Sequence, residues 1–180
     1  MQYLEQLPVV TPARPNSAVS MRARALFGLS IMLSLVSSGV AAALFVWPAL
    51  HTLNRHTALL WLVAPHMFLR LLGLSFLVPG VVSASLPEQW AKPAAYGDLT
   101  AGVLAIIATT ALATGATWAI AAVWIFNVEG AVDLLYAYYE GGRIKLDPGS
   151  LGAGFYIVTA IVPPLLVTHA LIFLLLIGHS

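Results

Sequence analysis

The 180-residue chain contains no cysteine, and this absence excludes several kinds of chemistry at once. Disulfide bonds, thiolate nucleophiles, cysteine-ligated zinc and thiolate-held iron–sulfur clusters all require cysteine. The sequence therefore carries no information about the redox state of the compartment in which the protein works.

Charged residues are also scarce. They make up 8% of the chain, whereas hydrophobic residues make up 60%, and the mean hydropathy is +0.91. A soluble domain carries roughly 25% charged residues, so this chain cannot build an ordinary water-facing surface. The net charge of +1 argues against a nucleic-acid partner, which would require a strongly basic surface. The composition predicts an integral membrane protein.

Familiar catalytic motifs are missing as well. The sequence contains no P-loop, no GxSxG and no HExxH, and its five histidines are too few for the histidine boxes of membrane desaturases. No lysine lies in a predicted span, which excludes a retinal Schiff base. The sequence therefore leaves open whether the protein is an enzyme.

Long apolar runs dominate what is present. Each is long enough for a helix crossing a hydrocarbon core of ~30 Å, and the alternation of a membrane barrel is absent. The expected spans are about 25–48, 57–79, 98–114, 117–139 and 150–177. These predict an all-α, five-helix polytopic bundle over residues 25–180, preceded by a polar tail at 1–24. The first run resembles a signal peptide with the small-residue stretch GVAAA, but it continues to Trp47, which favours a membrane anchor.

Local signals predict several helix ends. Thr57 is a candidate N-cap, and Ser85 with Glu88 fits a capping box that would start a short surface helix. Asp98 and Asp147 are likewise interpreted as N-caps. Residues 114–117 predict a tight hairpin.

Basic residues predict how the chain threads through the membrane. One side would receive Arg14, Arg22, Arg24, Lys92, Arg143 and Lys145, and the other only Arg55. Because cytoplasmic loops are enriched in Lys and Arg, the N-terminus is expected in the cytoplasm and the C-terminus across a bacterial inner (plasma) membrane. Aromatic belts agree with this threading. They would comprise Trp47, Trp61 and Trp118 on the outer side and Trp90, Tyr136, Tyr138 and Tyr139 on the inner side.

Polar residues inside the spans are the candidate functional residues, because burying such groups is costly. They are His66, Arg70, Asn127, Glu129, Asp133 and His169. Counting 1.5 Å per residue places them at similar depths, which predicts one buried cluster. Arg70 stays charged and is expected to pair with Glu129 or Asp133, joining the second and fourth spans. The remaining carboxyl would hold a proton or face a charged histidine. The pair could equally be purely architectural.

Prolines are expected to bend two of the spans. Pro65 would bend the second span beside His66. Pro163 and Pro164 would kink the fifth and free the carbonyls of Thr159 and Ala160.

Three functions fit this pattern. The favoured one is binding of a lipophilic ligand, such as a lipid or quinone, or service as an accessory subunit of a membrane complex. A homo-oligomer within membrane lipids fits the same interpretation. A second is a b-type cytochrome whose haem is ligated by His66 and His169. The third is a membrane-embedded enzyme or proton-coupled carrier that uses the protonatable carboxyl.

Overall fold

The computed structural model describes residues 17–178, and every regular element in that range is a helix. Five helical segments are long and apolar enough to cross a membrane: Met21–Leu50, Arg55–Leu77, Glu88–Ala113, Ala119–Arg143 and Gly154–Ile177. The prediction of an all-helical chain with five such segments is confirmed for the described residues.

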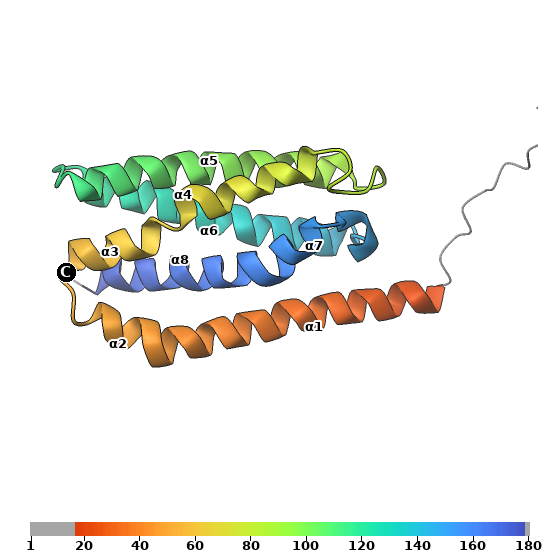
Figure 1. Cartoon of the computed structure of the whole chain (residues 1–180), viewed down its shortest axis with the longest axis horizontal. Helices are drawn as coiled ribbons and strands as arrows, with labels where there is room; N and C mark the ends of the chain where they lie inside the picture. Colours follow the sequence, from red (N-terminus) through yellow and green to blue (C-terminus); the bar gives the residue numbers. More distant parts are fainter. Residues whose placement is uncertain (1–16, 179–180) are drawn as a thin grey trace, which may run out of the picture.

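The five segments lie side by side along the long axis of the molecule (Figure 1). The loop at 51–54, the hairpin at 114–118 and the end of the last helix share one end of the bundle. The start of the first helix, the 78–87 loop and the 144–153 loop share the other. We call the first of these the hairpin end and the second the basic end. Successive segments therefore run in opposite directions, as five membrane crossings require.

The first segment consists of α1 (Ser17–Ala41), a π-helical turn η1 (Ala42–Val46) and α2 (Trp47–Leu50). The helix begins at Ser17, so residues 17–24 of the predicted polar tail are helical. The rest of that tail, including Arg14, lies outside the described residues. The first segment packs mainly on the fifth (Figure 1), and its other faces are exposed and apolar.

The second segment is divided into α3 (Arg55–Val63), α4 (His66–Leu69) and a 3₁₀ helix η2 (Arg70–Leu77). Asn54 caps α3, because its Oδ1 accepts a hydrogen bond from the backbone N–H of Thr57 at 2.9 Å. The predicted cap at Thr57 was therefore wrong. Pro65 separates α3 from α4, where a bend was expected.

The 3₁₀ winding of η2 aligns its buried residues. Arg70, Gly73 and Phe76 are buried and follow each other at intervals of three. A 3₁₀ helix has three residues per turn, so the three form one straight row. In an α-helix, with 3.6 residues per turn, each step of three would rotate the row by about 60°.

The third segment, α5 (Glu88–Ala113), corrects the predicted start of this span at residue 98. The expected surface helix and third span are one continuous helix, with Pro93 inside its second turn. No capping box forms, because the helix begins after Pro87 without a side-chain cap. Alanines spaced along one face are buried, including Ala95, Ala101 and Ala105, and their small side chains allow close packing against the next helix.

The fourth segment is α6 (Ala119–Arg143), reached through the predicted hairpin, in which Gly115 adopts a positive φ of 67°. A 3₁₀ turn η3 (Pro148–Leu151) follows, and Asp147 caps it by accepting from the N–H of Gly149. Asp147 was expected to cap the last helix itself, but the fifth segment begins only at Gly154. The fifth segment contains α7 (Gly154–Tyr156), η4 (Ile157–Ile161) and α8 (Val162–Ile177). The prolines at 163 and 164 open α8, and the helix before them is widened into the π-helical turn η4.

Two apolar clusters occupy the two ends of the bundle. The cluster at the hairpin end includes Leu59, Val63, Ala105, Val123 and Ile172. The cluster at the basic end includes Phe76, Trp90, Ala95, Leu151 and Val158. Trp90 was predicted to belong to an interfacial belt, but only 4% of it is exposed. Its indole N–H instead donates to the carbonyl of Ala137 at 2.9 Å.

Candidate functional site: a buried polar layer

Polar side chains lie between the two apolar clusters on each of the last four segments. The layer comprises His66, Arg70, Asp98, Asn127, Asp133, Thr168 and His169. On the second, third and fifth segments the polar residues fall in sequence between the buried residues of the two clusters, so the layer crosses the middle of the bundle.

Arg70 is the centre of the layer, and its side chain is fully buried. Nη1 contacts Oδ1 of Asp98 at 2.5 Å, and Nη2 contacts Oδ2 of Asp133 at 3.2 Å. Nη2 also donates to the backbone carbonyl of Gly130 at 2.8 Å. We call Arg70, Asp98 and Asp133 the ion-pair cluster. It joins the second, third and fourth segments.

The sequence predicted only part of this cluster. Asp133 pairs with Arg70, which is one of the two partners expected for it. No ion pair between Arg70 and Glu129 forms within residues 17–178, and Oε2 of Glu129 is buried without a hydrogen-bond partner there. Asp98 was interpreted as an N-cap, and this was wrong, because the residue lies inside α5 and is only 6% exposed. Its place in the stripe of buried small residues along α5 was the signal that could have identified it.

Three glycines make room for the polar side chains. A Cβ on Gly73 would overlap the carboxylate of Asp98, and one on Gly97 would overlap that of Asp133. A Cβ on Gly130 would lie 2.6 Å from Cε1 of His169. The backbone of three different segments is therefore shaped around these groups.

The two buried histidines contact each other, with ring centroids 4.6 Å apart. Thr168 donates its hydroxyl to the carbonyl of Leu165, so its oxygen accepts from Nε2–H of His66 at 2.9 Å. Asn127 donates its amide to the carbonyl of His169, so its Oδ1 accepts from Nδ1–H of the same residue at 2.8 Å. These roles assign one neutral tautomer to each ring.

In each imidazole ring the other nitrogen is unprotonated and accepts no hydrogen bond from residues 17–178. Nδ1 of His66 and Nε2 of His169 are buried and have no hydrogen-bond partner in the described part of the chain. Phe126 lies against both rings, with centroid distances of 5.0 and 5.2 Å, and closes this part of the layer on its apolar side.

The histidine pair does not fit a haem. Two imidazoles that ligate one haem iron stand on opposite faces of the porphyrin, whereas these two rings are in direct contact and Nε2 of His66 is held by Thr168. No group of three or more His, Asp or Glu side chains among residues 17–178 is placed to hold a metal ion.

The charges of the layer do not balance with every carboxyl ionised. The ion-pair cluster holds one guanidinium and two carboxylates, and its histidine neighbours are neutral in the assigned tautomers. Since a net charge inside an apolar bundle is costly, a neutral cluster requires a proton on one of the two carboxyls. Glu129, one turn before Asp133 on α6, adds a third carboxyl nearby.

Two adjacent hollows lie on the basic-end side of the layer, and the smaller one reaches it. A small cavity of about 20 Å³ is lined by Asp98 and Asp133, among others, and is large enough for about one water molecule. A larger pocket of about 310 Å³ lies between α1, the start of α5 and the end of α6. The two hollows share four lining residues: Trp90, Ala137, Tyr138 and Val158.

The two shared aromatic side chains are held in place by hydrogen bonds to backbone carbonyls. Trp90 donates to Ala137, and the Tyr138 hydroxyl donates to Val158 at 2.7 Å. One wall therefore separates the larger pocket from the ion-pair cluster.

A family model described as "Domain of unknown function (DUF8737)" matches residues 26–177. That range contains almost all of the five helical segments and every residue of the polar layer. No curated protein and no solved structure matches the chain.

Proposed function

The chain belongs to the DUF8737 family, whose description names no activity. From the geometry of its candidate site, we propose that this protein is a small integral membrane protein that binds a lipophilic ligand. The ligand occupies the pocket of about 310 Å³ between α1, α5 and α6. We call this the interhelical pocket.

The observation that carries the proposal is the wall shared between the interhelical pocket and the carboxylate-lined cavity. Ligand sites are typically apolar hollows of about 300–1,000 Å³ with a few polar groups placed within them. The interhelical pocket meets this description, with Asp98 and Asp133 directly behind its wall. A small movement of Trp90 or Tyr138 would join the two hollows and bring a polar group of the ligand to the ion-pair cluster.

The membrane setting and its orientation support the same proposal. Arg22, Arg24, Lys92, Arg143 and Lys145 belong to segments and loops at the basic end of the bundle. Arg55 belongs to the hairpin end, where it donates to the carbonyls of Leu175 and Leu176 at the end of α8. The basic end is therefore assigned to the cytoplasm, by the bias of cytoplasmic loops toward Lys and Arg.

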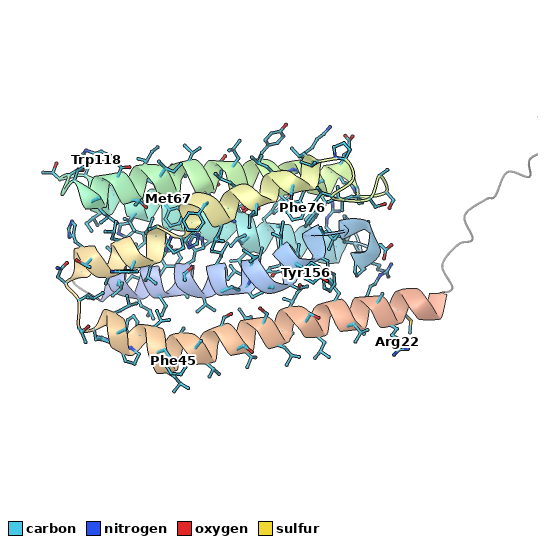
Figure 2. The ribbon with its side chains drawn as sticks, viewed as in Figure 1. Arg22, Phe45, Met67, Phe76, Trp118 and Tyr156 are labelled. Atoms are coloured by element: carbon cyan, nitrogen blue, oxygen red, sulfur yellow. The ribbon has the colours of Figure 1, made fainter. Side chains whose placement is uncertain are left out.

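The exposed face of α1 fits a subunit role in a larger complex or a homo-oligomer. Met32, Val36 and Phe45 on this segment are each more than half exposed. Figure 2 shows Phe45 on the side turned away from the other helices. Lipid or a neighbouring subunit would cover this face, and cross-linking in intact membranes distinguishes the two.

The test is the identity of what copurifies with the protein. The protein is extracted in lipid nanodiscs, and organic extracts are compared with bulk lipid by mass spectrometry. Gly28→Leu fills the interhelical pocket, since nothing lies within 4 Å of a Cβ at this position. Gly39→Leu is the matched control, because it lies on the same helix, is equally open and does not line the pocket.

We expect a lipid or quinone enriched over bulk lipid in the wild type and in Gly39→Leu, and lost in Gly28→Leu. Equal amounts in all three proteins would contradict binding in this pocket. The absence of any enriched molecule from the wild type would contradict ligand binding altogether.

A second candidate, proton relay, is favoured by the excess of carboxyls over cations around Arg70. A carboxyl that must hold a proton in the resting state is suited to releasing and regaining it. The measurement is proton flux into proteoliposomes that contain a pH-sensitive dye and carry an imposed membrane potential. Proton relay predicts a flux above that of empty liposomes, abolished in Asp133→Asn with the helical content unchanged. A proton flux through the wild-type protein equal to that of empty liposomes would contradict proton relay.

A further inference from the structure

Two cationic side chains line the interhelical pocket, and no carboxylate does. Arg24 comes from the second turn of α1, and Lys145 comes from the turn that ends α6. The remaining lining consists of glycines, apolar side chains and the two aromatic residues of the shared wall. The polar atoms of those two aromatics already bond to backbone carbonyls. The pocket is therefore apolar within and positively charged at one edge.

Two other basic residues at the basic end, Lys92 and Arg143, have carboxylate partners. Lys92 pairs with Glu88 at 2.5 Å, and Arg143 forms a two-point contact with Glu140. Arg24 and Lys145 form no ion pair within the described residues, so their charges are available to a ligand. The second large hollow at this end shows the contrast, because its lining includes both members of the Lys92–Glu88 pair.

Lys145 occupies a backbone position that favours glycine. Its φ is +52°, which makes it the one non-glycine residue with positive φ among residues 17–178. The N–H of Leu146 bonds to the carbonyl of Gly141, and that of Lys145 to Gly142, which together form a Schellman motif at the end of α6. Glycine is the usual residue at this place in the motif. A lysine there accepts unfavourable backbone geometry and places a cation at the pocket edge.

From this juxtaposition we infer that the interhelical pocket accepts an anionic phospholipid. Its phosphate lies between Arg24 and Lys145, and an acyl chain lies against the apolar lining around Phe27 and Val158. Both cations are at the end of the bundle assigned to the cytoplasm, where anionic headgroups attract basic side chains. The inference rests on the proposed ligand-binding function and names the chemical class of the ligand.

The experiment measures lipid binding to the purified full-length protein by native mass spectrometry. The probes are phosphatidylglycerol, with phosphatidylcholine as a zwitterionic reference and inorganic phosphate as a competitor. The test variants are Arg24→Gln and Lys145→Asn. Asparagine removes the charge at 145 but tolerates positive φ. Arg22→Gln is the matched control, because Arg22 is exposed on the same helix and lies outside the pocket lining, on the side of α1 away from the bundle (Figure 2).

We expect phosphatidylglycerol to bind the wild type more tightly than phosphatidylcholine does. Each test variant should weaken phosphatidylglycerol binding about fivefold, the contribution of one basic residue near an anionic surface. Arg22→Gln should leave it unchanged. Lys145→Gly adds a sharper test, since it should raise the thermal stability of the protein while weakening phosphatidylglycerol binding.

Three results would overturn the inference. Equal losses in Arg22→Gln and Arg24→Gln would indicate diffuse attraction rather than a site. Displacement of the lipid by inorganic phosphate alone would indicate a free-anion site. If both lipids bind alike and only Gly28→Leu removes them, the pocket binds lipophilic molecules without regard to charge. In that case the proposal of lipophilic-ligand binding stands, and the inference of an anionic phospholipid fails. If Gly28→Leu also has no effect on lipid binding, both the proposed function and this inference fail.

Discussion

Replacing Arg70 with methionine tests the charge arrangement of the buried layer directly. Methionine keeps much of the length of the side chain but removes the one cation among residues 17–178 that pairs with Asp98 and Asp133. Breaking a buried ion pair by removing one partner costs about 3–5 kcal/mol, because the other charge is left buried and uncompensated. In the neutral cluster one of these carboxyls is ionised and the other holds a proton. Removing Arg70 takes the cation from the ionised carboxylate and a contact from the protonated carboxyl, so we expect a loss in the free energy of unfolding toward the upper end of that range.

Neutralising one carboxylate should cost much less. Asp98→Asn leaves Arg70 paired with Asp133, and the amide oxygen can still accept from Nη1. The loss is then the difference between a charged and a neutral hydrogen bond, about 1–1.5 kcal/mol. The two variants should therefore differ by roughly 2–4 kcal/mol.

The assay is reversible unfolding of the purified protein in mixed micelles, titrated with a denaturing detergent and followed by far-ultraviolet circular dichroism. The stability deficit of Arg70→Met should shrink in mildly acidic buffer, where a proton neutralises the carboxylate that has lost its cation. Arg22→Gln, an exposed arginine outside the layer, should change little. If Arg70→Met is no less stable than Asp98→Asn, or if its deficit does not respond to pH, the charge argument is wrong.

Three further variants test other parts of the fold in the same unfolding assay. Gly73→Ala should lower the free energy of unfolding by several kcal/mol, because its Cβ would overlap the carboxylate of Asp98. Gly39→Ala is the control and should be neutral or slightly stabilising, because its Cβ meets nothing within 4 Å. Similar values for the two variants would contradict the close packing of Gly73 against Asp98. Asn127→Leu should cost about 1–3 kcal/mol by leaving Nδ1–H of His169 unpaired, and unchanged stability would refute that hydrogen bond. Asn54→Ala should cost about 1 kcal/mol and speed amide hydrogen exchange in the first turn of α3, and exchange as slow as in the wild type would contradict its role as the cap.

The membrane-length helices were predictable because long apolar runs are a property of the sequence itself. Helix ends were less predictable, since several residues near an end satisfy the same local rule. Asn54 and Thr57 are both good caps, and only the three-dimensional fold selects the first. At the start of the third segment, the cap signals at Ser85 and Asp98 pointed to two helices. Close packing of buried alanines on the neighbouring segments favours one continuous helix instead.

The sequence predicted how far along each helix the site residues lie, but not the direction in which each helix points them. Counting along the helices predicted similar depths for His66, Arg70, Asn127, Glu129 and His169, with Asp133 somewhat deeper. In the structure the ring of His66 contacts that of His169, and Arg70 pairs with Asp133. Which carboxylate meets Arg70 depends on how each helix is rotated about its axis, and a sequence does not give that angle. Asp98 shows the same limit, because its local sequence fits a helix cap as well as a buried partner.

The 3₁₀ winding of η2 also changes how far the second segment reaches. At ~2.0 Å per residue, the eight residues of η2 span ~16 Å, whereas an α-helix of the same length would span ~12 Å. The extra ~4 Å equals the rise of roughly three α-helical residues. The 23 residues of Arg55–Leu77 therefore extend about as far as the 26 residues of Glu88–Ala113 beside them. The broken second segment thus extends as far along the bundle as its unbroken neighbour with fewer residues.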